Sequence, residues 1–163
     1  MHVRVVATVV IARGTGRGRA GHHCDSRLWG IAGYSGTPLA QKLGIKPGGR
    51  VLVAAAPPEL DLGDVPSGAL VHTRAGTKSY DVIVAFCPDL RRLRRRFPAL
   101  VPRLSTAGAL WICWPKRASG VASDLDENVV RDVGLDAGLV DVKVAAVDDV
   151  WSGLKFVWRV RDR

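Results

Sequence analysis

The chain has 163 residues, of which 47% are hydrophobic and 24% charged, and its formal net charge is +9. This length and composition predict one globular domain with a substantial core and exclude a disordered chain. No apolar run reaches the roughly 20 residues that a membrane helix needs, so we expect no membrane association. The cysteines are Cys24, Cys87 and Cys113, and their wide spacing favours reduced thiols in a cytoplasmic protein.

The excess positive charge comes from two local segments. Residues 1–30 contain five arginines and one aspartate, and a second cluster consists of Arg91, Arg92, Arg94, Arg95 and Arg96. The remainder is balanced, so the charge does not predict a basic face that runs through the whole fold.

Residues 1–31 differ in composition from the rest of the chain. A short apolar run precedes the segment "RGTGRGRAG", which has no buried strand before it and no helix after it, and so is not a phosphate-binding loop. His22, His23 and Cys24 lack a second pair of ligands, so we expect no metal site. We expect a disordered extension over 1–31, from a start codon assigned too far upstream, and a single domain over 32–163. A secretory signal is the weaker alternative, because no cleavage site follows.

The first half of the domain alternates between a helix and apolar strands. "SGTPLAQKLGI" predicts a short helix that is capped by Ser35 or Thr37 and ends at Gly44. "RVLVAAAP" and "YDVIVAFC" are fully apolar runs that favour buried parallel strands, and "GALVHTR" between them predicts a weaker strand near an edge.

The next segment predicts helices on either side of a third buried strand. In "PDLRRLRRRFPALVPRLS" the apolar residues recur at helical spacing, and we expect Pro98 to divide it into two helical pieces. "GALWICWP" is the strand. "SDLDENVVRDVGL" predicts a helix that is capped by Asp124 or Asp126 and ends before Gly134 or Gly138.

The C-terminal segments alternate with period two. In "LVDVKVAAV" the residues Val140, Val142 and Val144 alternate with Asp141 and Lys143, and "LKFVWRV" shows the same pattern. The short polar link between them predicts an antiparallel hairpin. The whole order predicts an α/β, doubly wound, mostly parallel sheet with a C-terminal antiparallel hairpin.

This order resembles the Rossmann-like methyltransferase fold. The resemblance rests on "IKPGGRVLV", "YDVIVAF", "LSTAGALWICW" and the final hairpin, with one early strand–helix unit absent. Such folds place glycines after the first strand, where the backbone approaches the cofactor. Here "VAAAPPEL" follows instead, and Pro57 and Pro58 have no backbone N–H to donate. Because no glycine-rich loop follows Val53, we expect neither S-adenosylmethionine nor a dinucleotide to bind.

The position of the strand ends gives the site hypothesis. In open α/β sheets, ligands bind outside the carboxyl ends of the parallel strands, and Lys116 follows one such end. The competing interpretation, a lysine that only solvates the exit from a buried strand, stays open. The further candidates for ligand binding are Ser119, Asp124, Trp151, Ser152 and Lys155.

A second resemblance covers about residues 32–161. The motifs "AGYSGTPLAQKLGIKPGGRVLV", "GALWICWPKRASGV" and "GLVDVKVAAVDDVWSGLKFV" are similar to an uncharacterised bacterial family, domain of unknown function 3052. The resemblance supports a domain that begins near residue 32 and implies no activity, cofactor or catalytic residue.

We therefore expect a non-catalytic or regulatory module that binds a small anion or an acidic protein at the carboxyl edge of the sheet. One alternative is an enzyme of unknown reaction at the same edge, with Lys116 acting together with Ser119 or Asp124. Another is nucleic-acid binding through the helix of Arg91–Arg96, although no aromatic residues are interleaved with these arginines.

Overall fold

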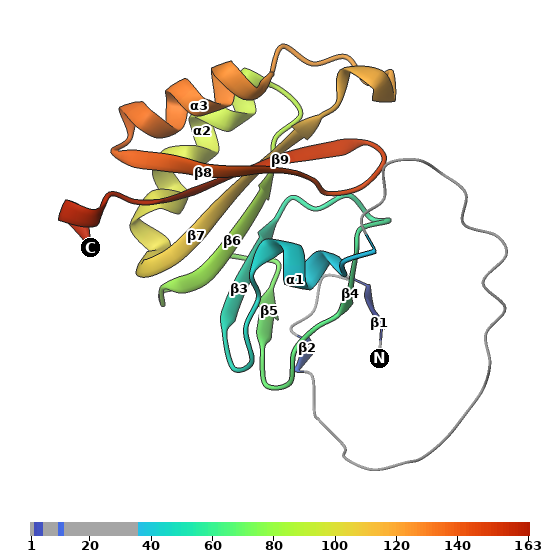
Figure 1. Ribbon diagram of the computed structural model, residues 1–163, viewed down its shortest axis with the longest axis vertical. Helices are drawn as coiled ribbons and strands as arrows, with labels where there is room; N and C mark the ends of the chain where they lie inside the picture. The colour runs from blue at the N-terminus through green and yellow to red at the C-terminus, as the bar shows by residue number, and fades with distance from the viewer. Residues whose placement is uncertain (1, 5–9, 12–35) are drawn as a thin grey trace, which may run out of the picture.

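The computed structural model describes residues 2–4, 10–11 and 36–163 (Figure 1). Most of the predicted disordered extension over 1–31 lies outside these residues. The segment His22–Cys24 and the predicted cap Ser35 lie wholly outside them. The described elements of the N-terminal part are β1 (His2–Arg4) and β2 (Val10–Ile11). Within the described residues, no helix has both the length and the apolar content required to cross a membrane.

The described strands form one seven-stranded sheet in the order β2-β5-β3-β6-β7-β9-β8 and a two-stranded sheet of β1 and β4 (Asp61–Asp64). The parallel strands of the large sheet are β3 (Arg50–Ala54), β5 (Leu70–His72), β6 (Tyr80–Phe86) and β7 (Leu104–Pro115). The hairpin strands β8 (Leu139–Ala146) and β9 (Trp151–Trp158) are antiparallel, and β9 pairs with β7. The predicted fold class is confirmed: the sheet is mixed, mostly parallel, and ends in an antiparallel pair.

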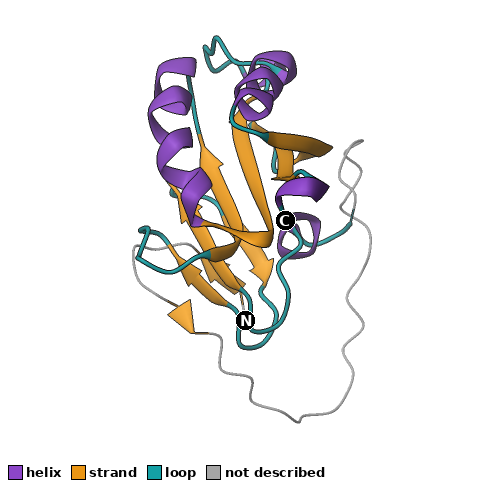
Figure 2. Ribbon diagram, turned by 90° about the vertical axis from the view of Figure 1, so that its left-hand side faces the viewer, coloured by secondary structure: helices purple, strands orange, loops and turns teal. Residues whose placement is uncertain are grey.

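The helices cover opposite faces of the sheet (Figures 1 and 2). Helix α1 (Leu39–Leu43) packs on one face over a core that includes Val51, Val84 and Trp111. Helices α2 (Leu90–Leu100) and α3 (Glu127–Asp136) pack on the other face over a core that includes Ile83 and Phe156. Short 3-10 turns follow α2 at Val101–Arg103, follow β7 at Arg117–Ser119, and end the chain at Val160–Asp162.

Helix α2 continues through Pro98, so the predicted division into two pieces is wrong. The buried residues Leu93, Phe97 and Leu100 form one apolar stripe on both sides of the proline, and their burial holds the last turn in place. Pro98 itself is exposed, and the amide hydrogen bond it cannot make would have reached the carbonyl of Arg94 on the solvent side.

The ends of the other two helices were predicted in part. Helix α1 ends as predicted at Gly44, whose φ of 80° is left-handed, but Pro38 rather than Thr37 occupies the N-cap position, and no side chain caps the helix. Helix α3 is capped by Asp126, which accepts a hydrogen bond from the amide of Val129 at 2.9 Å. It continues through Gly134 and ends at Asp136, before Gly138.

A β-bulge in β8 changes which side chains share a face. The register of β8 against β9 shifts between Asp141 and Lys143, and a bulge inserts one unpaired residue. Asp141 pairs with Arg131 of α3 at 2.9 Å, whereas Lys143 lies opposite Lys155 on the other face. Val142 and Val144 are 58% and 44% exposed. The simple alternation predicted for this strand is therefore wrong from Val142 onward.

Candidate functional site

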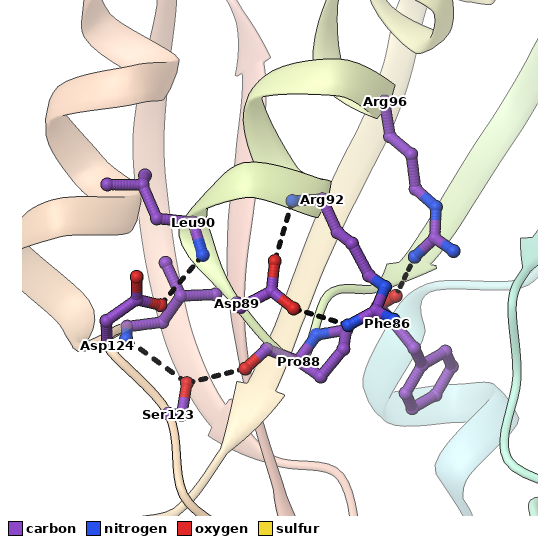
Figure 3. A network of polar contacts seen from close by, with 9 residues as sticks. Phe86, Pro88, Asp89, Leu90, Arg92, Arg96, Ser123 and Asp124 are labelled. Carbon is purple, nitrogen blue, oxygen red and sulfur yellow. Dashed lines mark hydrogen bonds and ion pairs between the residues drawn. The ribbon is translucent and has the colours of Figure 1, made fainter.

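The carboxyl edge of the sheet is the position where folds of this class bind ligands, and here the chain's own side chains occupy much of it (Figure 3). Asp89 follows β6 and caps α2 by accepting a hydrogen bond from the amide of Arg92 at 2.8 Å. Asp124 accepts a hydrogen bond from the amide of Leu90, also at 2.8 Å. Amides at a helix N-terminus are the groups that would bind an anion. Two carboxylates of the protein therefore take the place of an external anion.

The loop after β7 is fastened to the loop after β6 by Ser123. Its hydroxyl donates to the carbonyl of Pro88 at 2.8 Å and accepts from the amide of Leu125 at 3.1 Å. Together with Asp124, this serine holds residues 120–126 against the start of α2, as Figure 3 shows. The candidate residue Asp124 thus acts as a helix cap.

Lys116 connects the end of β7 to the turn between β8 and β9. Its Nζ donates to the carbonyl of Asp148 at 2.6 Å, and its amide donates to the carbonyl of Val150 at 2.7 Å. The hydroxyl of Ser119 donates to the carbonyl of Lys116 at 2.6 Å. The side chains of Lys116, Ser119 and Asp124 therefore have separate backbone partners, and these contacts do not assemble the three into one constellation.

The candidates Trp151 and Ser152 lie at the start of β9, whereas Lys155 lies near the middle of the strand. Trp151 pairs with Pro115 at the carboxyl edge, and its ring packs edge-to-face on Phe86 with the centroids 5.1 Å apart. Ser152 pairs with Trp114 beside it. Lys155 pairs with Trp111, further toward the amino edge, so the structure does not bring it together with Lys116.

The arginines of α2 divide into two groups. Arg91, Arg94 and Arg95 are exposed. Arg92 forms an ion pair with Asp89, and the guanidinium of Arg96 donates to the carbonyl of Phe86 at the end of β6. Two of the five predicted basic residues therefore have partners within the domain.

Burial favours the uncharged forms of Cys87, Cys113 and His72. Burial raises the pKa of the Cys87 thiol, which the nearby Arg96 offsets only in part, and burial raises the pKa of Cys113 far more. Burial, assisted by the charge of Arg50, lowers the pKa of His72. At neutral pH we expect protonated thiols and an uncharged imidazole.

The Asp89 cap predicts a pH-dependent contribution to stability. The hydrogen bond from the Arg92 amide, together with the Arg92 guanidinium, lowers the pKa of Asp89 below its usual range. A carboxylate whose pKa is lower in the folded state stabilises the fold above its unfolded pKa of about 3.9, and the stabilisation is lost as the pH falls through the folded pKa. In urea titrations we expect Asp89→Asn to lower the midpoint at pH 7 and to have a progressively smaller effect below pH of about 4. A difference that stays constant with pH would contradict an ionised cap.

Near the carboxyl edge, the start of α1, the loop after β3 and the β8–β9 turn enclose a cavity of about 370 Å³. Its charged lining residues are Lys42, Glu59, Asp61 and Asp148. Three carboxylates and one lysine give this cavity an acidic balance, which disfavours an anionic ligand.

A second cavity, of about 440 Å³, opens at the amino edge of the parallel strands. The turn after α1 contributes Lys46, Gly48 and Gly49, and β9 contributes Lys155. Its apolar lining includes Val82 and Ala109. The carboxylate of Asp81 also lines this cavity, but it accepts hydrogen bonds from the amide of Arg50 at 2.8 Å and the hydroxyl of Ser105 at 3.4 Å.

The bulge in β8 adds a third lysine beside this cavity. Lys143 lies directly opposite Lys155, and opposed residues of an antiparallel pair point to the same face of the sheet. Like charges in this arrangement repel each other. Within residues 36–163, none of Lys46, Lys143 and Lys155 forms an ion pair. The amino edge therefore has an excess of positive charge, which the carboxylate of Asp81 offsets only in part.

Sequence reasoning identified Lys155 but missed Lys46 and Lys143. Lys46 belongs to the segment "IKPGGRVLV", which pointed only to the fold, although a lysine next to glycines at a strand start was a visible signal. Lys143 gave no signal, because simple alternation places it on the same face as Asp141.

Comparison with known proteins adds little to this geometry. No protein family model matches the chain, and no curated protein matches it. Among solved structures, the chain is similar to a ribosomal protein L11 methylase from Lactobacillus delbrueckii subsp. bulgaricus, at 12% identity over 74% of each chain and with a TM-score of 0.49. The fold class rests on the strand order itself.

Proposed function

We propose that the domain is a non-catalytic binding module that takes a small anion in the amino-edge cavity. The observation that carries this proposal is that Lys46 and Lys155 line a cavity of about 440 Å³ and that Lys143 lies directly opposite Lys155. The carboxylate of Asp81 also lines the cavity, but among the described residues it forms no ion pair with these lysines. A bound anion would relieve the repulsion between the opposed lysines, so part of its binding free energy would come from the charges already present.

The lining favours an anion with an apolar body. Val82, Ala109 and Leu43 offer apolar surface. The lysine ammonium groups are compact charges that can donate hydrogen bonds to a phosphate or a carboxylate. We therefore propose a phosphate monoester or carboxylate that carries an apolar group. The half-buried Lys155 is the central contact, since it both lines the cavity and faces Lys143.

The carboxyl edge supports an anion less well, and our expectation that neither S-adenosylmethionine nor a dinucleotide binds there stays a proposal. Three features near this edge support the expectation that neither cofactor binds. Asp89 and Asp124 accept from the α2 amides, Pro57 and Pro58 supply no donor after β3, and Ala55 takes a strained backbone conformation with φ of 54° before them. The nearby cavity is acidic.

Binding of phenyl phosphate and inorganic phosphate, followed by isothermal calorimetry, tests the proposal. We expect phenyl phosphate to bind more tightly, because only it covers the apolar lining. A hydrogen bond to a charged group contributes about 1.5–3 kcal/mol, so Lys155→Ala should weaken binding about tenfold or more, and Lys46→Ala similarly. The control is Lys78→Ala, since Lys78 is exposed and does not line the cavity.

Lys116→Ala distinguishes the two edges of the sheet. If Lys116→Ala abolishes binding while Lys155→Ala leaves it unchanged, the anion site belongs to the carboxyl edge. If wild-type protein binds neither compound, the anion-binding function is rejected.

We further propose that the domain belongs to the uncharacterised bacterial family named above and works in the cytoplasm. The "WPK-x-ASG" motif forms the end of β7 and the turn that Ser119 closes, and "WSGLKF" forms β9 beside the proposed site. Cys87 and Cys113 are free, buried thiols, which agrees with a reducing compartment.

A further inference from the structure

Helices α2 and α3 lie side by side on the outer layer (Figure 1). Their side chains line a groove of about 540 Å³. The apolar surface of the groove includes Phe97 and Pro98 from α2 and Val129 and Val133 from α3. This groove lies on the face of the sheet opposite the lysine cavity, so it is independent of the proposed anion site.

The two walls of the groove carry opposite charge. Arg94 lines the α2 wall, and Arg91 and Arg95 are exposed on the same helix. Asp132 and Asp136 line the α3 wall. Among the described residues, Arg94 forms no ion pair with either aspartate, so both walls keep their charge.

We propose that the groove is an interface between two copies of this chain. Helices α2 and α3 follow the parallel strands β6 and β7, and both return toward the amino edge, so they run in the same direction. A two-fold axis along the groove places α2 of one copy over α3 of the other. Arg94 of each copy then faces Asp132 and Asp136 of its partner, as an isologous interface requires.

Charge selects this arrangement over the alternatives. A two-fold axis across the groove would place α2 on α2 and α3 on α3, with like charges facing each other. A nucleic acid bound over the groove would place its phosphates against Asp132 and Asp136, which is unfavourable. A second copy related by the axis along the groove places an opposite charge against each wall.

Reciprocal charge variants test the interface. In sedimentation experiments at increasing concentration, we expect wild type to form a dimer that weakens with salt. Arg94→Glu and Asp132→Lys should each weaken the dimer about tenfold or more, because close interfacial charge pairs couple by about 1.5 kcal/mol or above. A mixture of the two variants should recover a heterodimer, since the retained Arg94 faces the retained Asp132 and the introduced charges are also opposite.

The control is Arg95→Glu, which changes the same charge on α2 at a position that does not line the groove, and circular dichroism confirms folding of each variant. A wild-type protein that remains monomeric at every concentration would overturn the interface. Failure of the mixed variants to associate would overturn the proposed pairing. Retention of DNA by monomeric wild type, lost in Arg94→Glu, would instead assign α2 to nucleic-acid binding.

Discussion

Replacing Gly134 with alanine is expected to destabilise the domain by about 1–3 kcal/mol, the usual cost of overpacking a core. In an ordinary helix the same change stabilises, because glycine costs about 1 kcal/mol relative to alanine. Here a Cβ atom at position 134 would lie 2.5 Å from Cζ of Phe156 and closer still to Cε1. Phe156 is fully buried and packs edge-to-face on Phe97, with centroids 6.1 Å apart. The ring therefore has no free space into which it can move, and the clash decides the sign.

Urea titration of Gly134→Ala against wild type measures this effect. Gly36→Ala is the matched control, because Gly36 is exposed and an added Cβ would meet nothing within 4 Å, so its effect should stay within about 0.5 kcal/mol. A midpoint for Gly134→Ala at or above that of wild type would show that α3 shifts away from the sheet at little cost.

Replacing Trp111 with alanine is expected to cost about 3–5 kcal/mol, a large part of the roughly 5–15 kcal/mol by which domains of this kind are stable. Trp111 is completely buried in the core beneath α1. Its Nε1 donates to the carbonyl of Leu43 at 3.0 Å and so ties the end of α1 to the centre of the sheet. Leu43 and Gly44 also line the amino-edge cavity, so the same contact positions one side of the proposed site.

Trp111→Phe separates packing from hydrogen bonding. It keeps most of the apolar volume and removes the donor, and a lost partner for a buried polar group costs about 1–3 kcal/mol. We expect its urea midpoint to lie between those of wild type and Trp111→Ala. Equal midpoints for both variants would assign the whole effect to the hydrogen bond.

The apolar runs were sufficient to predict the central strands and the hairpin, because burial on both faces or on one face leaves a direct pattern in the sequence. The same reasoning placed Pro98 at a helix break and Gly134 at a candidate helix end. The rules that proline and glycine end helices are local, and tertiary packing outweighs them here. The buried stripe that ends in Leu100 extends α2 beyond Pro98, and Gly134 leaves space inside α3 for the ring of Phe156. Strand β4 was missed because it is short and has one buried residue, Leu62.

The site was predicted less well than the fold, since a site depends on register and direction. Trp151 and Lys155 are four positions apart in the sequence, yet β9 runs from one edge of the sheet toward the other, and only Lys155 reaches the lysine cavity. Alternation also cannot reveal a bulge, so the face that Lys143 shares with Lys155 was not predictable. The contacts of Lys116 with the β8–β9 turn required knowledge of which loops meet at the carboxyl edge.

The carboxylates that cap α2 also affect the field around the molecule. Asp89, Asp124 and Asp148 lie at one end of the sheet strands, and Lys46, Lys143 and Lys155 lie toward the other. At the carboxyl end, Arg92, Arg96 and Lys116 offset these carboxylates, whereas at the amino end Asp81 offsets the three lysines only in part. The excess of positive charge therefore lies toward the amino end of the strands. A diffusing anion would be attracted toward the amino end before any contact forms, over a range of about 10 Å at 0.1 M salt. Because carboxylates of the domain already accept from the α2 amides, the amino end is the preferred direction of approach for an anion.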